Sequence, residues 1–323
     1  MTKIDTKDRK IISELDMNAR IPTTELAKKV GLSRQAVEYR INRLRKENVL
    51  IGAFAVFDST VVGHCWYRVA LQLLNTTKEE KDLLIQYLQD KKEIMWIGEV
   101  GGNWDLVFNF LAKDNFEFNK IFEEIITQNK NIIKRYEILI YINVIDMERS
   151  YIFEQQRERR SFFHKMKYNN KIKLDELDTN IIRELSKNAL TPDLELGRKY
   201  SVSGKTIRNR IKDLEKHKII LGYRMFINPS ALNYLSHMLF LGINNVDLQK
   251  EKALQEYLKT IPNVAFIVKH IGRWRIGMEI ETKDAKEFQD IFVSIRGQFS
   301  DIITDFESFP LFKDHTVNYF PGI

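Results

Sequence analysis

The chain opens with apolar residues at helical spacing. Ile11, Ile12 and Leu15 share one helix face, and a polar interruption precedes a short second helix that ends at Gly31. Ser33 is a good N-cap for a third helix. In this helix, apolar residues at i, i+4 and i+7 form a single inward face: Val37, Ile41 and Leu44. The pattern predicts three helices, and residues 48–57 continue them as a β-rich ribbon, which we interpret as a wing.

The other side of the third helix is polar. Two short helices joined by a tight turn, the second with long polar side chains facing outward, are typical of a helix-turn-helix that lays its recognition helix in the DNA major groove. We therefore expect double-stranded DNA as the partner. The candidate DNA-binding residues of this helix are Ser33, Arg34, Gln35, Glu38, Tyr39, Arg40, Asn42 and Arg43.

The pattern changes after residue 53, where strand-like and helix-like runs alternate. Strands are predicted at 64–75, 94–100, 105–112 and 132–144, and helices at 78–91 and 114–128. The order βαββαβ is that of a ferredoxin-like fold, in which two helices cover one face of a four-stranded sheet. The other face needs a partner, so we expect sheet-to-sheet pairing.

Every one of these features occurs twice. A shift of 170 residues brings Asp5 onto Asp175 and Pro22 onto Pro192, and far downstream it still pairs Trp104 with Trp274. The sequence thus predicts an α+β fold of two winged helix-turn-helix domains, each followed by a ferredoxin-like domain. The expected ranges are 1–52 and 171–222 for the helical heads, 53–146 and 223–323 for the ferredoxin-like domains, and 147–170 for a basic connector.

In the second head, Ser203 caps the third helix and Ile207, Ile211 and Leu214 face inward. Gly204 weakens the first turn of this helix by up to about 1 kcal/mol relative to Ala. One head could instead bind protein rather than DNA, although the basic side chains of the second head favour phosphate. Its candidate DNA-binding residues are Ser203, Lys205, Thr206, Arg208, Asn209, Arg210 and Lys212.

The three helices of each head could also form a plain bundle with a solvated, charged face. The distribution of charge along the chain distinguishes this alternative from a DNA-binding head. Residues 1–52 hold 12 Lys and Arg against 7 Asp and Glu, and residues 171–222 hold 12 against 8. The connector holds 6 against 3, whereas the whole chain carries only +7, so the rest of the chain is acidic. Positive charge concentrated in the heads is the electrostatic footprint of phosphate neutralisation. We interpret the connector itself as too polar for a core. Its basic side chains could contact DNA, but we expect most of them only to solubilise a helix: Arg157, Arg159, Arg160, Lys165 and Lys167.

Other classes of function find little support in the sequence. The single cysteine, Cys65, cannot form an internal disulfide, and there is no zinc-like His/Cys spacing. No catalytic set, phosphate-binding glycine loop or paired carboxylate motif occurs, so we expect no enzyme, cofactor or metal. No secretory signal and no membrane-spanning run is found. We expect a soluble, cytoplasmic protein.

The first head resembles the Lrp/AsnC, or feast/famine, family of prokaryotic regulators. The resemblance is carried by Asp5-x-x-Asp8-Arg9-Lys10-Ile11-Ile12, Asn18-Ala19-Arg20-Ile21, Glu25-Leu26-Ala27, Val30-Gly31-Leu32-Ser33 and Arg40-Ile41-x-Arg43-Leu44. It implies that the βαββαβ part is a RAM domain, which in that family mediates dimer and octamer assembly and often binds an amino acid. The second head departs at two positions, where Ser201 replaces Gly31 and Gly197 replaces Ala27.

The resemblance also implies a site for an amino-acid effector, in a loop with the pattern Gly-x-aromatic-Asp. The first copy matches it with Gly102, Asn103, Trp104 and Asp105, whereas the second has Gly272, Arg273, Trp274 and Arg275. A guanidinium in place of a carboxylate reverses the charge offered to an ammonium group. Any such site is therefore expected in the first copy. The alternative is that both tryptophans simply fill the interface between the sheets.

The siroheme decarboxylases look like the same pairing of domains and give an enzymatic alternative. Only His270 lies in a stretch that could serve such chemistry, and a lone histidine is more often a packed residue. The regulator is the better interpretation. Because the two recognition helices differ at nearly every outward position, we expect an intramolecular pseudo-dimer that reads an asymmetric DNA site and in turn can form a homodimer.

Overall fold

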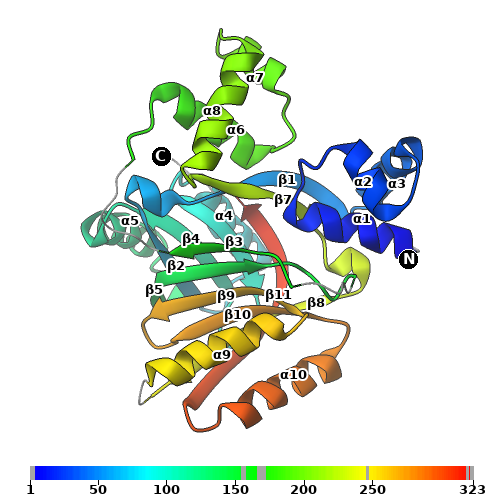
Figure 1. Ribbon diagram of the computed structural model, residues 1–323. Helices are drawn as coiled ribbons and strands as arrows, with labels where there is room; N and C mark the ends of the chain where they lie inside the picture. The colour runs from blue at the N-terminus through cyan, green and yellow to red at the C-terminus, as the bar shows by residue number, and fades with distance from the viewer. Residues whose placement is uncertain (1–3, 154–157, 166–171, 245–246, 318–319, 321–323) are drawn as a thin grey trace.

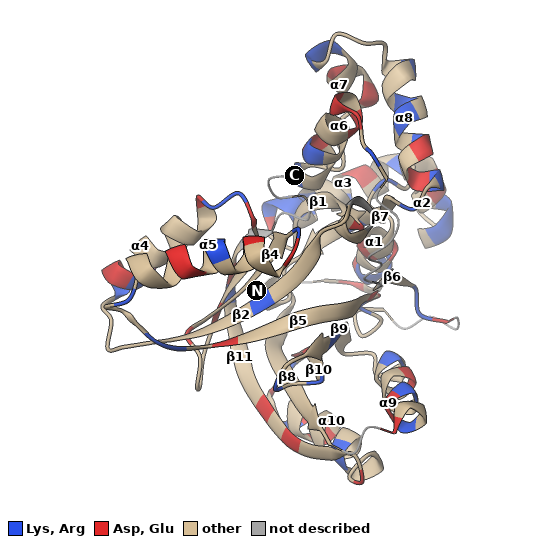
Figure 2. Ribbon diagram, turned by 90° about the vertical axis from the view of Figure 1, so that its left-hand side faces the viewer, with Lys and Arg blue, Asp and Glu red and all other residues tan. Residues whose placement is uncertain are grey.

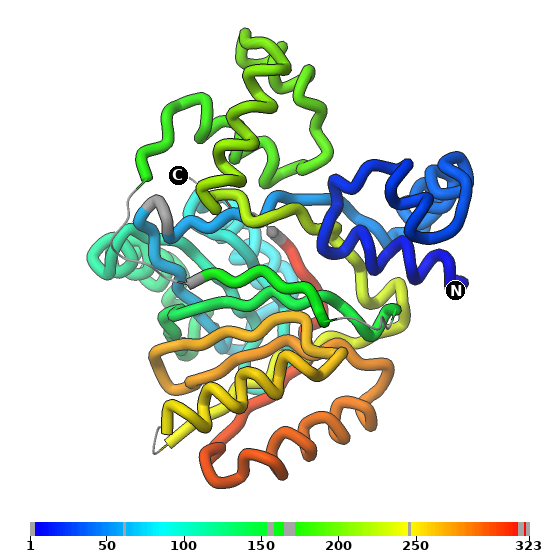
Figure 3. The backbone as a smooth tube through the Cα atoms, in the orientation of Figure 1, coloured from blue at the N-terminus to red at the C-terminus, as the bar shows by residue number. Residues whose placement is uncertain are grey.

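The computed structural model describes residues 4–153, 158–165, 172–244, 247–317 and 320 of the 323-residue chain (Figure 1). Two helical heads lie on one side of a β-barrel, and the path of the chain between them can be followed in Figure 3. The heads comprise α1 (Thr6–Met17), α2 (Thr23–Val30) and α3 (Arg34–Lys46), and α6 (Glu176–Lys187), α7 (Asp193–Lys199) and α8 (Gly204–Lys216).

Local capping explains where α1 and α3 of the first head begin and where α2 ends. The side chain of Asp5 accepts a hydrogen bond from the backbone N–H of Asp8, and the Asp8 side chain accepts one from Asp5, which together form a capping box. The Ser33 hydroxyl accepts from the backbone N–H of Ala36 at 3.2 Å, as predicted. Gly31 ends α2 with a φ of 66°, a left-handed conformation that favours glycine.

The turn of the second head has the same geometry without a glycine. Ser201, at the position of Gly31, adopts a φ of 55°. Gly197 compensates nearby, because a Cβ atom there would lie 2.7 Å from the backbone oxygen of Val202. The two departures of the second head from the first therefore belong to one tight α7–α8 packing, and the helix-turn-helix geometry is retained.

The βαββαβ order is confirmed in both copies. The first comprises β2 (Cys65–Leu73), α4 (Lys78–Gln89), β3 (Ile94–Val100), β4 (Leu106–Ala112), α5 (Asn115–Gln128) and β5 (Ile133–Met147). The second comprises β8 (Leu235–Ile243), α9 (Leu248–Thr260), β9 (Val264–Ile271), β10 (Ile276–Thr282), α10 (Ala285–Gln298) and β11 (Ile303–Val317). Apolar clusters join α4 and α5 to the first sheet and α9 and α10 to the second, so each sheet has one face covered by its own helices.

The two sheets pair with each other, as expected, and they also join along both edges. β5 pairs with β2 through its first half and with β9 through its second, and β11 likewise pairs with β8 and then with β3. Eight strands thus close into a ring, so the edge strands of both sheets are paired. The inner faces meet in an apolar cluster that includes Trp104 and Trp274, 4% and 2% exposed.

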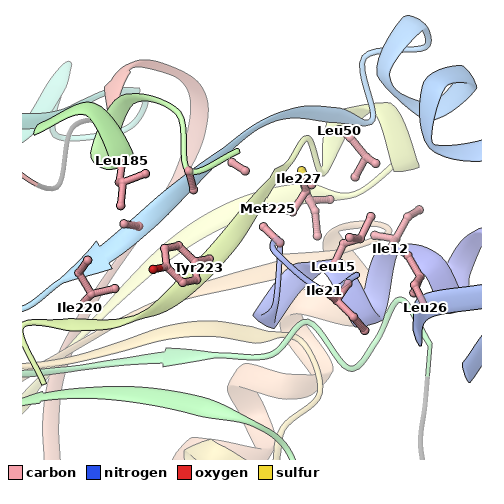
Figure 4. Packing of buried hydrophobic residues seen from close by; sticks show 14 of the residues in the cluster. Ile12, Leu15, Ile21, Leu26, Leu50, Leu185, Ile220, Tyr223, Met225 and Ile227 are labelled. Atoms are coloured by element: carbon pink, nitrogen blue, oxygen red, sulfur yellow. The ribbon is translucent and has the colours of Figure 1, made fainter. Parts of the chain in front are cut away.

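The expected wing strand pairs with its counterpart from the other copy. β1 (Leu50–Phe57) runs antiparallel to β7 (Ile220–Ile227), because neither head supplies a second strand next to its own. Both strands lead through a short 3₁₀ turn, Ser59–Val62 or Ser230–Leu232, into the barrel. The β1–β7 ribbon packs against both heads in one continuous core. Figure 4 shows Leu15 and Ile21 of the first head, Leu185 of the second and Tyr223 and Met225 of the ribbon in this core.

The interpretation of the connector as lying outside the core was wrong for its described part. β6 (Ser161–Lys165) adds to the sheet beside β5, and His164 is fully buried. The Arg159 guanidinium donates to the backbone carbonyls of Lys259, Ile261 and Val264 at 2.7–2.9 Å. Polar side chains are thus tolerated here because they find partners on burial. Arg157 and Lys167 lie outside the described residues.

Candidate nucleic-acid interface and the polar network behind it

The N-terminal half of α3 presents the polar side chains expected to contact DNA. Ser33, Arg34, Gln35, Tyr39 and Asn42 are exposed, and the Tyr39 ring is 70% exposed. Glu38 is half-buried, and the Arg34 guanidinium donates to its carboxylate at 2.7 Å. This pair lies on the surface, where an ion pair contributes little to stability. Both side chains can therefore exchange this contact for one with DNA at small cost.

Arg40 and Arg43 are already engaged within the head. Arg40 lies 2.7 Å from Asp5 and 2.8 Å from Asp8, and Arg43 also pairs with Asp8, whose side chain is fully buried. Hydrogen bonds to Asp5 and Asp8 raise the pKa of Arg40. The backbone N–H of Asp8, assisted by Arg40, lowers the pKa of Asp5 to about 2. These contacts fix α3 against the start of α1, so both arginines position the recognition helix.

The second head repeats this division between free and engaged side chains. Ser203, Lys205, Asn209 and Lys212 are exposed on α8, whose basic positions can be followed in Figure 2, and Thr206 is half-buried beside the cap. The engaged side chains are two arginines. Arg208 pairs with Asp193 at 2.9 Å, and Arg210 pairs with Asp175 at 2.7 Å and with Asp178 at 3.3 Å.

Behind the first head lies a buried network of charges that the sequence did not reveal. Asp16, at the end of α1, contacts Arg224 of the ribbon at 2.7 Å and Arg149 at 3.2 Å. The Arg149 guanidinium also donates to both carboxylate oxygens of Glu281 on β10 at 3.0 Å. Burial opposes ionisation of Asp16, but the attraction of Arg224 and Arg149 outweighs it and keeps the pKa of Asp16 below its ordinary value. The network links α1 to the ribbon and the barrel.

No local sequence pattern could have predicted this network, because each carboxylate lies at least 132 residues from the arginine that it contacts. The second copy lacks it. At a shift of 170 residues, Asp16 corresponds to Ser186 and Arg224 to Phe54. The two heads are therefore attached to the barrel by different means.

The residues of the expected effector loop make contacts within the protein. The Asn103 amide donates to Glu307 at 2.9 Å, and the Asp105 carboxylate accepts the backbone N–H of Leu73 at 2.7 Å. Trp104 is buried in the barrel, while Gly102 forms the turn with a φ of 78°. In the second copy, the Arg273 guanidinium lies over the ring of Trp274, 4.4 Å from its centroid. The interface-filling alternative accounts for both tryptophans, and the effector site at this loop stays a prediction.

A cavity of about 470 Å³ lies between the ribbon and the barrel interior. Its floor contains Arg68, which donates to Asn109 at 2.9 Å, and Tyr141, whose hydroxyl donates to the same Asn109 oxygen at 2.9 Å. The aromatic rings of Trp96 and Phe266 form part of its wall. The ribbon residues 51–54 and 226–229 cover it, so the cavity adjoins the element that joins the two heads.

His270 is not among the residues that line this cavity. It is fully buried and packs edge-on against the Tyr141 ring, with centroids 5.0 Å apart. Burial, assisted by the charge of Arg68, holds its pKa well below the usual range. Among the described residues, no group of three or more His, Cys, Asp or Glu could hold a metal ion. In the same part of the chain, no helix is both long and apolar enough to cross a membrane.

Comparison with known proteins agrees with this geometry. The AsnC-type helix-turn-helix domain matches residues 4–45 and 174–215, one match in each head. The regulator LrpA of Pyrococcus horikoshii is 33% identical over 131 residues, which are 40% of this chain and 90% of LrpA. LrpC of Bacillus subtilis is 28% identical over 41% of this chain and 90% of its own length. Each relative thus corresponds to one unit of the duplication.

A solved structure covers nearly the whole chain. The siroheme decarboxylase NirDL matches 98% of this chain and 94% of its own with a TM-score of 0.64, at 13% identity. At that identity the likeness shows the fold alone. The sequence relatives, the two matched heads and their geometry agree. The chain belongs to the Lrp/AsnC family of transcriptional regulators, with the helix-turn-helix and sheet unit duplicated in tandem.

Proposed function

We propose that this regulator binds double-stranded DNA through both α3 and α8 and recognises an asymmetric operator. One observation carries the proposal: a single body holds two complete helix-turn-helix heads whose recognition helices present different side chains. Gln35 corresponds to Lys205 and Glu38 to Arg208. Glutamate can accept a hydrogen bond from a cytosine amine, whereas arginine only donates and favours guanine or phosphate. The half-sites should therefore differ.

The engaged arginines support a division of labour within each head. Arg40, Arg43 and Arg210 hold their helices through carboxylates at the N-terminal ends of α1 and α6. The exposed side chains at the start of each recognition helix are left for base edges, which is where a helix-turn-helix makes its specific contacts. Exposed lysines such as Lys205 and Lys212 supply charge for phosphate.

The fold neighbour NirDL makes a decarboxylase the competing function. The substrate of a decarboxylase carries carboxylates, and a buried site for them needs cations without other partners. Of the three arginines that line the cavity, two are already held by carboxylates. Arg149 is bound by Glu281 and Asp16, Arg224 is bound by Asp16, and Arg68 donates to Asn109. This arrangement favours the regulator over the enzyme.

Selection of bound fragments from a random DNA library, followed by footprinting, tests the proposal. The expected result is an asymmetric site in which Gln35→Ala changes the preference in one half and Lys205→Ala weakens the other. Lys113→Ala, at an exposed side chain outside both heads, is the matched control. A short palindrome bound equally well after removal of the second head would overturn the proposal. A haem-type absorbance in the purified protein would favour the enzyme.

A further inference from the structure

The cavity beneath the β1–β7 ribbon has lost the symmetry of the duplication. At a shift of 170 residues, Asn109 of β4 corresponds to Glu279 of β10, and Arg68 of β2 corresponds to Met238 of β8. All four residues line the cavity. In the first copy, Arg68 and Tyr141 both donate to the Asn109 amide oxygen. In the second copy, the carboxyl group of Glu279 takes the place of the Asn109 amide, and Met238 takes the place of Arg68.

Glu279 is left without a partner. No hydrogen bond or ion pair to it is found among the described residues, although the residue is half-buried in the wall of the cavity. A buried carboxylate is costly unless it is paired. Accordingly, burial raises the pKa of Glu279 to about 8, with further contributions from Glu281 and Asp314 and opposing ones from Arg149 and Arg68.

Of the three arginines that line the cavity, Arg68 donates to Asn109 and opposes the rise in the pKa of Glu279 without cancelling it. Arg149 and Arg224 are bound by Glu281 and Asp16, which are fully buried. Asp314 adds a second carboxyl group, held only by a hydrogen bond from the Trp96 indole at 2.7 Å. The residue is exposed, but the surrounding protein desolvates its carboxyl group enough to raise the pKa of Asp314. Among the described residues, neither of these two carboxyl groups forms an ion pair, and aromatic rings lie beside them in the cavity lining.

We propose that this cavity is a binding site for a small organic cation, a protonated amine with an apolar or aromatic body, whose ammonium group is held by Glu279. A volume of about 470 Å³ is typical of small-molecule sites. The ammonium supplies the missing partner of Glu279 and also faces Asp314. The rings of Trp96, Tyr141 and Phe266 provide the apolar wall.

The position of the site connects it to the first head. Glu279 and Glu281 are two residues apart on β10 and therefore point to the same face of the strand. Glu281 binds Arg149, which binds Asp16 of α1. A cation beside Glu279 lies near the Arg149 guanidinium and repels it. Occupancy of the cavity therefore weakens the contacts of Arg149 that attach the first head to the barrel. The second head, with Ser186 in place of Asp16, lacks this connection.

Calorimetric titration of the full chain without DNA tests the site independently of operator binding. The probes are butylamine, phenethylamine and tryptamine, each compared with a carboxylate of similar skeleton: pentanoate, 3-phenylpropionate and indole-3-propionate. At least one amine is expected to bind saturably and to raise the Tm, whereas the carboxylates are not. Glu279→Gln should weaken binding of that amine at least tenfold, because it removes a charged hydrogen-bond acceptor.

Two further variants separate a specific site from a structural effect. Glu279→Asp keeps the charge and should retain more of the amine affinity than Glu279→Gln. Glu123→Gln, an exposed change on α5, should leave it unaltered. The proposal is overturned if none of the amines binds, if the carboxylates bind in their place, or if Glu279→Gln binds the amine as tightly as the unaltered chain.

Discussion

The Arg224 guanidinium lies 2.7 Å from the Asp16 carboxylate, although 208 residues separate them and both side chains are almost completely buried. Arg224 belongs to the ribbon strand of the second copy and Asp16 to the first helix of the chain. The pair therefore holds the first head on a strand contributed by the other copy. Because Arg149 approaches the same carboxylate, Asp16 is the centre of the network.

Removal of the Asp16 charge should strongly destabilise the fold. Asp16→Ala leaves Arg224 buried without its main carboxylate and removes one of the two carboxylates of Arg149, and breaking a buried ion pair in this way costs about 3–5 kcal/mol. Denaturant unfolding followed by circular dichroism measures the loss. Asp82→Asn, an exposed change on α4, is the control and should stay within about 0.5 kcal/mol of the unaltered chain. An equally small effect of Asp16→Ala would show that the network is not structural.

DNA affinity should fall steeply as salt is added. Both heads carry excess positive charge, and each phosphate neutralised contributes a log–log salt slope of about −0.9 on duplex DNA. Fluorescence anisotropy with a selected operator at several salt concentrations gives the slope. Lys212→Ala, at an exposed position on α8, should reduce its magnitude by about 1 if the side chain contacts a phosphate. An affinity that does not change with salt would contradict the electrostatic interpretation.

Gln35 should read bases, and Arg40 should not. Gln35→Ala is expected to alter sequence preference at one or two positions, at a cost of about 1–3 kcal/mol. Arg40→Ala removes the contacts with Asp5 and Asp8 and should instead lower the Tm and weaken binding to all sequences alike. Parallel library selections and thermal melts distinguish the two effects. A uniform weakening by Gln35→Ala would assign Gln35 to the DNA backbone.

The pH dependence of stability should reveal Glu279 directly. Its pKa rises from an ordinary value of 4.5 to about 8 in the folded chain, so the folded state binds more protons than the unfolded state between these values. The free energy of unfolding therefore falls as pH increases through this range. Glu279→Gln removes that contribution, and its stability relative to the unaltered chain should increase from about pH 5 to about pH 8. A constant difference between the two proteins would show that Glu279 titrates normally.

Periodicity and self-similarity were sufficient to establish the architecture and the location of the recognition helices. The inward face of α3 and its cap at Ser33 follow from local spacing, because helix periodicity and capping depend on neighbours a few residues away. The βαββαβ order is equally local. The duplication was visible because corresponding residues keep one offset along the whole chain.

Tertiary structure alone decided how the two copies are joined. Three features depend on contacts between distant segments. They are the pairing of β1 with β7, the sharing of β5 and β11 between the two sheets, and the burial of Arg149 beside Asp16 and Glu281. The cost of burying a charge is met only by a partner in space, so a sequence pattern read as a solvated connector became part of the core. For the same reason, Glu279 and Asn109 were indistinguishable from ordinary polar strand residues until the barrel placed them in one cavity.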